Sequence, residues 1–246
     1  IRYQGSVLGY LWAVLRPMLL FAILYTVFAK ILKMGGDIPH YSVYLMTGTV
    51  FWSFFSECTS QGIQAIVGRS DLLRKISFPK WIIVVSSTIT ALINFLINLC
   101  VIIVFALLNG VTPSFTWLLA PLVILELYLL SLGIAFFLGS INVKYRDISS
   151  IWEVLMQALF YAVPIIYPIT MVSASSAVAV KILLLNPIAQ VIQDARYLLI
   201  TDQSITVWNF IDNIFLRFLP VLITLFILTI GSIYFRKHSK YFAEEA

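Results

Sequence analysis

Residues 81–125 read WIIVVSSTITALINFLINLCVIIVFALLNGVTPSFTWLLAPLVIL, and this stretch contains no Asp, Glu, Lys or Arg. A membrane-crossing helix needs about 20 apolar residues to cover about 30 Å of hydrocarbon. The stretch is long enough for two such helices, and the turn-forming residues 109–114 (NGVTPS) divide it. It therefore predicts two membrane spans joined by a short turn.

The composition of the whole chain agrees with a lipid environment. Of its 246 residues, 61% are hydrophobic and 11% are charged, and the mean hydropathy is +0.99. A soluble domain usually carries about 25% charged residues. The net charge is +5, and the basic residues lie singly or in small groups between apolar runs, which does not fit nucleic-acid binding. Cys58 and Cys100 lie within apolar runs, so we expect reduced, structural thiols.

The same length criterion, applied to the rest of the chain, predicts an all-α polytopic membrane protein with six transmembrane helices in one domain, 1–246. The span nearest the amino terminus is marginal because Lys30 lies near its end, where a lysine can reach the membrane interface. We also expect sequence to precede Ile1, because no Met starts the chain. The predicted spans are residues 17–34, 41–67, 81–108, 116–141, 151–169 and 215–235.

Two further segments do not have the pattern of simple spans. In residues 1–16, apolar side chains recur at helical spacing between polar ones, which predicts an amphipathic helix lying in the membrane interface. Residues 177–201 are apolar but broken by Asn186–Pro187, so each half is too short to cross. We expect two short re-entrant outer helices there, with an extracellular loop resting on the bundle as the alternative.

The distribution of Lys and Arg predicts the orientation, because cytoplasmic connections are enriched in them. With both termini in the cytoplasm, eleven of the 16 basic residues lie inside and five outside. The cytoplasmic set is Arg2, Arg16, Arg69, Arg74, Lys75, Lys80, Lys144, Arg146, Arg236, Lys237 and Lys240.

Two carboxylates, Glu57 and Glu126, lie inside predicted spans. A charge at the centre of a bilayer costs roughly 2.5–3.5 kcal/mol on insertion scales, which makes each a candidate for a polar path. Each can equally well hydrogen-bond a neighbouring helix or carry a proton. Because Glu57 lies about 22 Å and Glu126 about 13 Å below the outer end of its span, we expect no shared metal or proton relay.

Aromatic residues gather in the second and fifth predicted spans. Phe51, Trp52, Phe55 and Tyr161 belong to these groups. Aromatic faces can stack on sugar rings, but composition alone favours packing within the bundle as the explanation of such a group.

The loop 68–80 has more structure than a simple basic loop requires. Asp71 can cap a short helix that Pro79 ends, and Leu72, Leu73 and Ile76 share one face of it. An apolar face on a cytoplasmic helix predicts a partner that buries it.

These features together resemble one family, the membrane subunits of type-two ABC exporters, in the branch that exports polysaccharides and teichoic acids. The resemblance covers essentially the whole chain. It depends on RYQGSVLGYLW (2–12), LLRKISFP (72–79), NVKYRD (142–147), LNP (185–187) and the tail FRKHSKYF (235–242).

The resemblance implies a homodimer in the bacterial cytoplasmic membrane, with two copies of a separate ABC ATPase and a lipid-linked polymer as cargo. It implies that this chain binds no cofactor and that ATP and Mg belong to the partner, in keeping with the absence of a GxxxxGK[ST] motif. It assigns coupling to the ATPase to Asp71, Leu72, Leu73, Arg74, Lys75, Phe78 and Pro79. With the features above, the expected substrate entrance and path consist of Arg2, Tyr3, Trp12, Arg16, Phe51, Trp52, Phe55, Glu57, Glu126 and Tyr161.

Two other functions stay open on the sequence alone. An exporter of small hydrophobic compounds or lipids would share most of these features. A membrane enzyme acting on lipid-linked sugars would need acid and base groups that converge at one interface. The two histidines, His40 and His238, are expected on opposite sides of the membrane, which argues against the enzyme.

Overall fold

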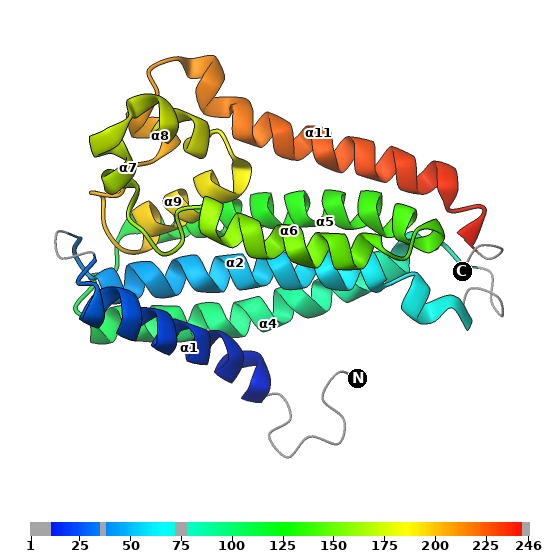
Figure 1. The fold of residues 1–246 in the computed structure, drawn as a ribbon, viewed down its shortest axis with the longest axis horizontal. Helices are drawn as coiled ribbons and strands as arrows, with labels where there is room; N and C mark the ends of the chain where they lie inside the picture. Colours follow the sequence, from blue (N-terminus) through cyan, green and yellow to red (C-terminus); the bar gives the residue numbers. More distant parts are fainter. Residues whose placement is uncertain (1–10, 35–37, 72–77, 243–246) are drawn as a thin grey trace.

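The computed structural model describes residues 11–34, 38–71 and 78–242, and within these ranges every regular element is a helix (Figure 1). The longer elements are α1 (Trp12–Leu24) with its π-helical continuation η2 (Tyr25–Ile31), α2 (Tyr41–Gln64), α4 (Trp81–Leu108), α5 (Ala120–Lys144), α6 (Ile148–Ala162) and α11 (Ile214–His238). The shorter ones are η3 (Val67–Arg69), η4 (Phe115–Leu119), α7 (Ile169–Ser175), α8 (Ala177–Leu184), α9 (Pro187–Leu199) and α10 (Val207–Phe210).

Helix α2 lies in the middle of the bundle. It packs against α1, α4, α5, α6 and α9, whereas α11 lies along α5 on the outside (Figure 1). Val43, Leu45 and Phe55 of α2 are fully buried. Because its neighbours rather than lipid surround it, α2 can carry Ser, Thr, Gln and Glu side chains that a lipid-facing helix avoids.

Four helical segments of the described chain are long and apolar enough to cross a membrane: Trp12–Ile31, Trp81–Leu108, Phe115–Lys144 and Ile214–His238. They correspond to four of the six predicted spans. Helix α2 has 24 residues but is less apolar. Helix α6 has 15 residues, a length of about 22 Å.

The first helix continues through the position where a boundary was expected. The predicted interfacial helix was to end at Arg16, but α1 runs from Trp12 through Pro17 without a break, and residues 1–10 lie outside the described part of the chain. A proline inside a helix leaves the carbonyl four residues earlier without its usual donor. Asn98 of α4 supplies that donor, because its Nδ2 lies 3.0 Å from the carbonyl oxygen of Ala13.

The fifth predicted span, 151–169, ends earlier than expected. Helix α6 stops at Ala162, and Val163 is extended, with φ −85° and ψ 141°. Because the residue before a proline avoids the helical region, Pro164 ends the helix and not Pro168. Residues 169–175 form a separate helix, α7, which the sequence did not predict.

The outer segment breaks where Asn186–Pro187 predicted. The Asn186 side chain accepts a hydrogen bond from the Ile188 amide and so caps α9, and Pro187 occupies the first turn. Helices α8 and α9 meet at 95°, and together with α7 they form one end of the molecule (Figure 1). Helix α9 packs against α2 and α5, and nearly all its residues are buried.

Arg196 of α9 ties this end together. Its side chain is fully buried and donates hydrogen bonds to the carbonyl oxygens of Tyr44 (3.1 Å), Pro164 (2.6 Å) and Ile165 (2.7 Å). A Cβ atom on Gly48 of α2 would collide with the guanidinium. Arg196 therefore satisfies carbonyls that the break after α6 removes from regular helical bonding.

Candidate functional site

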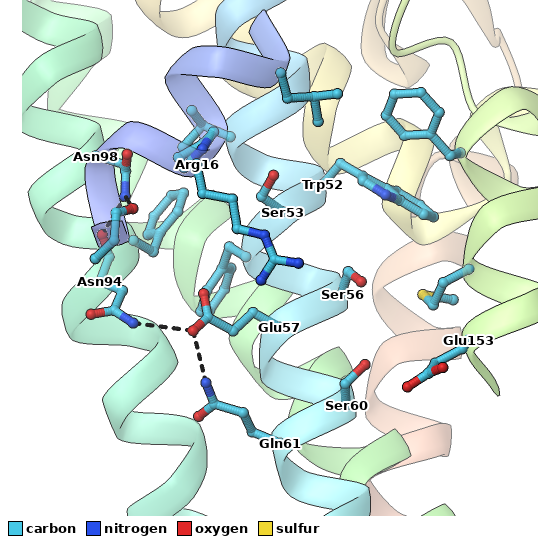
Figure 2. Close-up of a pocket in the computed structure, with 18 of the residues that line it drawn as sticks. Arg16, Trp52, Ser53, Ser56, Glu57, Ser60, Gln61, Asn94, Asn98 and Glu153 are labelled. Atoms are coloured by element: carbon cyan, nitrogen blue, oxygen red, sulfur yellow. Dashed lines mark hydrogen bonds between the residues drawn. The ribbon is translucent and has the colours of Figure 1, made fainter. Parts of the chain in front are cut away.

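A cavity of about 1070 Å³ lies between α1, α2, α4 and α6 (Figure 2). Lining residues come from all four helices, which are far apart in the sequence. Both apolar and polar side chains contribute, and the charged ones are Arg16, Glu57 and Glu153.

The polar wall of the cavity belongs mainly to α2. Ser53, Ser56, Ser60 and Gln64 follow one another at spacings of three or four residues, so they share one face of the helix. Figure 2 shows the three serines along the α2 ribbon beside Glu57. This face gives hydroxyl and amide groups to a cavity inside an otherwise apolar bundle.

Glu57 is held in place by neutral amides. Its Oε1 atom accepts hydrogen bonds from Gln61 Nε2 (2.7 Å) and Asn94 Nδ2 (3.1 Å). Arg16 extends from α1 toward the same carboxylate, and Glu153 lies across the cavity on α6 (Figure 2). The cavity thus offers a guanidinium, two carboxylates and several neutral donors and acceptors.

Five predicted path residues line this cavity: Trp12, Arg16, Trp52, Glu57 and Tyr161. Phe51 and Phe55 are not among its lining residues. Phe51 packs edge-on against Phe95, with ring centroids 5.0 Å apart, and Phe55 lies between Trp52 and Trp152. Arg2 and Tyr3 lie outside the described residues.

Glu126 was expected on the substrate path, but it is not among the residues that line the cavity. Its Oε2 atom accepts a hydrogen bond of 3.4 Å from Gln190 Nε2 on α9. The same amide group donates to Asp194 Oδ2 at 2.6 Å, which also accepts from Trp208 Nε1. Glu126 therefore joins α5 to the outer helices.

Several lining residues were not predicted from the sequence. They are the serines of α2, Asn94 and Asn98 on α4, and Glu153 and Gln157 on α6. A signal was present, since Asn94–Asn98 and Glu153–Gln157 are polar pairs four residues apart in apolar surroundings. Only the assembled helices show that these pairs face one space.

The predicted coupling segment is only partly described. Leu72, Leu73, Arg74 and Lys75 lie outside the described residues, whereas Asp71 is exposed and Phe78 is partly buried against an apolar cluster. That cluster contains Ile66, Ile83 and Phe242. Within the described ranges, no group of three or more His, Cys, Asp or Glu side chains could hold a metal ion.

The long apolar helices that surround the polar cavity are those of a multi-pass membrane protein. In agreement, residues 1–200 match the family model for the membrane domain of ABC-2 type transporters. The chain belongs to that family and is a transporter subunit.

Three relatives of the chain are O-antigen export system permease proteins called RfbA. The chain is 34% identical to RfbA of Myxococcus xanthus over 189 residues, which cover 76% of this chain and 70% of the relative. It is 29% identical to an RfbA of Klebsiella pneumoniae over 197 residues, covering 80% and 74%. A second Klebsiella pneumoniae RfbA is 28% identical over 246 residues, covering 99% and 90%.

Proposed function

We propose that this chain moves a lipid-linked cell-envelope polymer, a polysaccharide such as O-antigen or a teichoic acid, across the bacterial cytoplasmic membrane. ATP hydrolysis on a separate ABC ATPase drives the movement. The observation that carries this proposal is the polar cavity of about 1070 Å³ inside an apolar helix bundle. The three relatives described above, all named as permeases of O-antigen export, support it.

The chemistry of the cavity suits a hydroxyl-rich cargo. Ser56, Ser60 and Asn94 offer donors and acceptors to sugar hydroxyls, and the rings of Trp52 and Tyr161 offer faces for stacking. Arg16 can pair with a phosphate of the lipid carrier. A small hydrophobic cargo would leave this polar wall without partners, so the cavity favours the polymer over the hydrophobic alternative.

The topology that fits this function has six crossings and both termini in the cytoplasm. Helices α2 and α6 supply the two crossings beyond the four apolar helical segments. The neighbours of α2 shield it from lipid. In this topology α8 and α9, which meet at 95°, dip into the outer leaflet without crossing. Two copies of the chain assemble with two copies of the ATPase, which contacts the 68–80 loop.

A reconstituted complex tests the proposal. The chain, purified with its ATPase and placed in proteoliposomes, should move a lipid-linked polymer only when ATP is present. Ser56→Leu puts an apolar side chain into the cavity and should lower transport about tenfold, since each unpaired buried polar contact costs on the order of 1–3 kcal/mol.

The matched control for this variant is Thr90→Leu, which makes a similar change on the exposed face of α4. It should transport at the wild-type rate. Equal rates for both variants would remove the cavity from the transport path, and transport without ATP would refute the ABC mechanism.

A further inference from the structure

The last described turn of the chain lies at the end of the bundle where the 68–80 loop connects α2 to α4. Helix α11 ends at His238, and Ser239–Phe242 continue as a turn, in which the Tyr241 amide donates to the His238 carbonyl at 3.0 Å. Figure 1 shows the end of α11 (red) and the segment after α2 (cyan) at the same end of the molecule. We call Ser239–Phe242 the terminal turn.

Phe242 fastens this turn by apolar contacts. Its side chain is fully buried in a cluster with Ile66, two residues after α2, and with Ile83 and Val84 at the start of α4. Its ring lies 5.2 Å from that of Phe235 on α11, measured between centroids. Phe78, at the end of the 68–80 loop, packs against the same cluster. One apolar cluster thus brings Phe242 together with residues at both ends of the loop.

Lys80 adds a polar connection between the loop and the turn. Its ammonium group donates hydrogen bonds to the carbonyl oxygens of Ser239 and Lys240 and lies 5.9 Å from the centre of the Phe242 ring. The carbonyls at the end of a helix lack intrahelical donors and carry partial negative charge, so a lysine is a suitable cap. Lys80, which directly precedes α4, therefore connects the start of α4 to the turn that follows α11.

We propose that the terminal turn is a positioning element for the 68–80 loop, and that Phe242 and Lys80 hold the base of this loop rigid against α4 and α11. This role depends on the proposed function, in which the ATPase pushes on the loop. A displacement of the loop reaches the helices only if its attachment does not yield. Through α11 the displacement continues to α5, where Gly231 and Gly133 bring the two backbones into direct contact.

The clamp itself can be tested on the full-length chain without its partner. Phe242→Ala should speed amide hydrogen exchange about tenfold at Ile82 and Ile83, whose amides bond to the Pro79 and Lys80 carbonyls in the first turn of α4. Tyr241→Ala is the matched control, because Tyr241 is 53% exposed. Unchanged exchange in Phe242→Ala, or the same increase in Tyr241→Ala, would overturn the clamp.

The coupling role is tested in the assembled complex by the amount of polymer moved per ATP hydrolysed. Phe242→Ala should lower this ratio about threefold or more while the complex still forms, since a looser attachment lets hydrolysis proceed without transport. Phe242→Leu should restore most of the ratio by refilling the cluster. A ratio equal to wild type in Phe242→Ala would overturn the coupling role.

These outcomes separate the two proposals. If the wild-type complex fails to transport with ATP, the proposed function fails and the coupling role fails with it. The exchange experiment is independent of that result, so it still decides whether the terminal turn clamps the loop.

Discussion

Arg196 shows how a single side chain can hold a broken region of a membrane protein. Its guanidinium makes hydrogen bonds to three main-chain carbonyls and to Gln193 Oε1, and it lies 3.5 Å from the centre of the Tyr44 ring. The planar, five-donor geometry of arginine permits this set of bonds, whereas lysine has one compact ammonium group.

We therefore predict that Arg196→Lys destabilises the fold. At least one buried carbonyl would lose its donor, and each such loss costs about 1–3 kcal/mol. A total of about 3 kcal/mol corresponds to a melting temperature about 10 °C lower for a chain of this size. Thermal unfolding of the detergent-solubilised protein measures the shift, with Arg69→Lys as the control because Arg69 is exposed. Identical melting temperatures for the two variants would contradict the role.

Several individual residues of the cavity and of the outer end could not be predicted from the sequence. Five of the ten predicted path residues line the cavity, because aromatic and charged residues in a span are conspicuous. The serines of α2 are common in helices and carry no such signal. The distribution of basic residues counts Arg196 only among the five expected outside. Its role could not be predicted, because its partners include main-chain carbonyls that no side-chain pattern can show.

At the scale of elements, α1 and α4 are joined by a side-chain hydrogen bond that replaces a missing main-chain one. Pro17 removes the donor for the Ala13 carbonyl, and Asn98 of α4 replaces it. The same Asn98 amide group donates to Asn94 O at 2.8 Å. The kink-prone position of α1 is thus supported from a neighbouring helix.

Because Asn98 replaces the donor that Pro17 removes, we predict that substitutions at these two positions have non-additive effects on stability. Asn98→Ala should destabilise the protein by about 1–3 kcal/mol, because the Ala13 carbonyl is left without a donor. Adding Pro17→Ala restores a main-chain amide four residues away, so the double variant should be more stable than Asn98→Ala alone. Unfolding free energies of the two single variants and the double variant give the coupling. Strict additivity would show that the two residues act independently.

Element boundaries followed from the sequence wherever a local signal set them. Helix α4 has the predicted bounds 81–108, because uncharged residues fill it and turn residues follow it. The break at Asn186–Pro187 was equally plain. The predicted end of the fifth span, residue 169, was wrong, because α6 ends at Ala162. Either Pro164 or Pro168 could end the helix, and the sequence did not show that Pro164 does.

At the scale of the whole molecule, the proposed topology places α7–α10 outside and the end of α11 inside the cell. Figure 1 shows these parts at opposite ends of the bundle. Four helical segments of the described chain have the length and hydropathy of membrane spans. In the proposed topology, two further crossings, α2 and α6, depend on their neighbours. If this topology is correct, hydropathy alone gives fewer crossings than the bundle contains, because a helix with a polar face fails the test.

Labelling with a membrane-impermeant thiol reagent checks this orientation. In a Cys100→Ala background, Gln203→Cys should react in intact cells and Lys237→Cys only after permeabilisation. Both positions are exposed, and the proposed topology puts them on opposite sides of the membrane. Native Cys58 is buried and should stay unlabelled. Labelling of position 237 in intact cells would reverse the proposed topology.

The contact between Gly48 and Arg196 has a further consequence for how such chains diverge. The guanidinium occupies the place where a Cβ atom at position 48 would project. A larger residue at 48 is tolerated only together with a shorter one at 196, so the two positions should vary as a pair across relatives. A lineage that replaces Arg196 then regains freedom at 48, and it must find another donor for the carbonyls after α6.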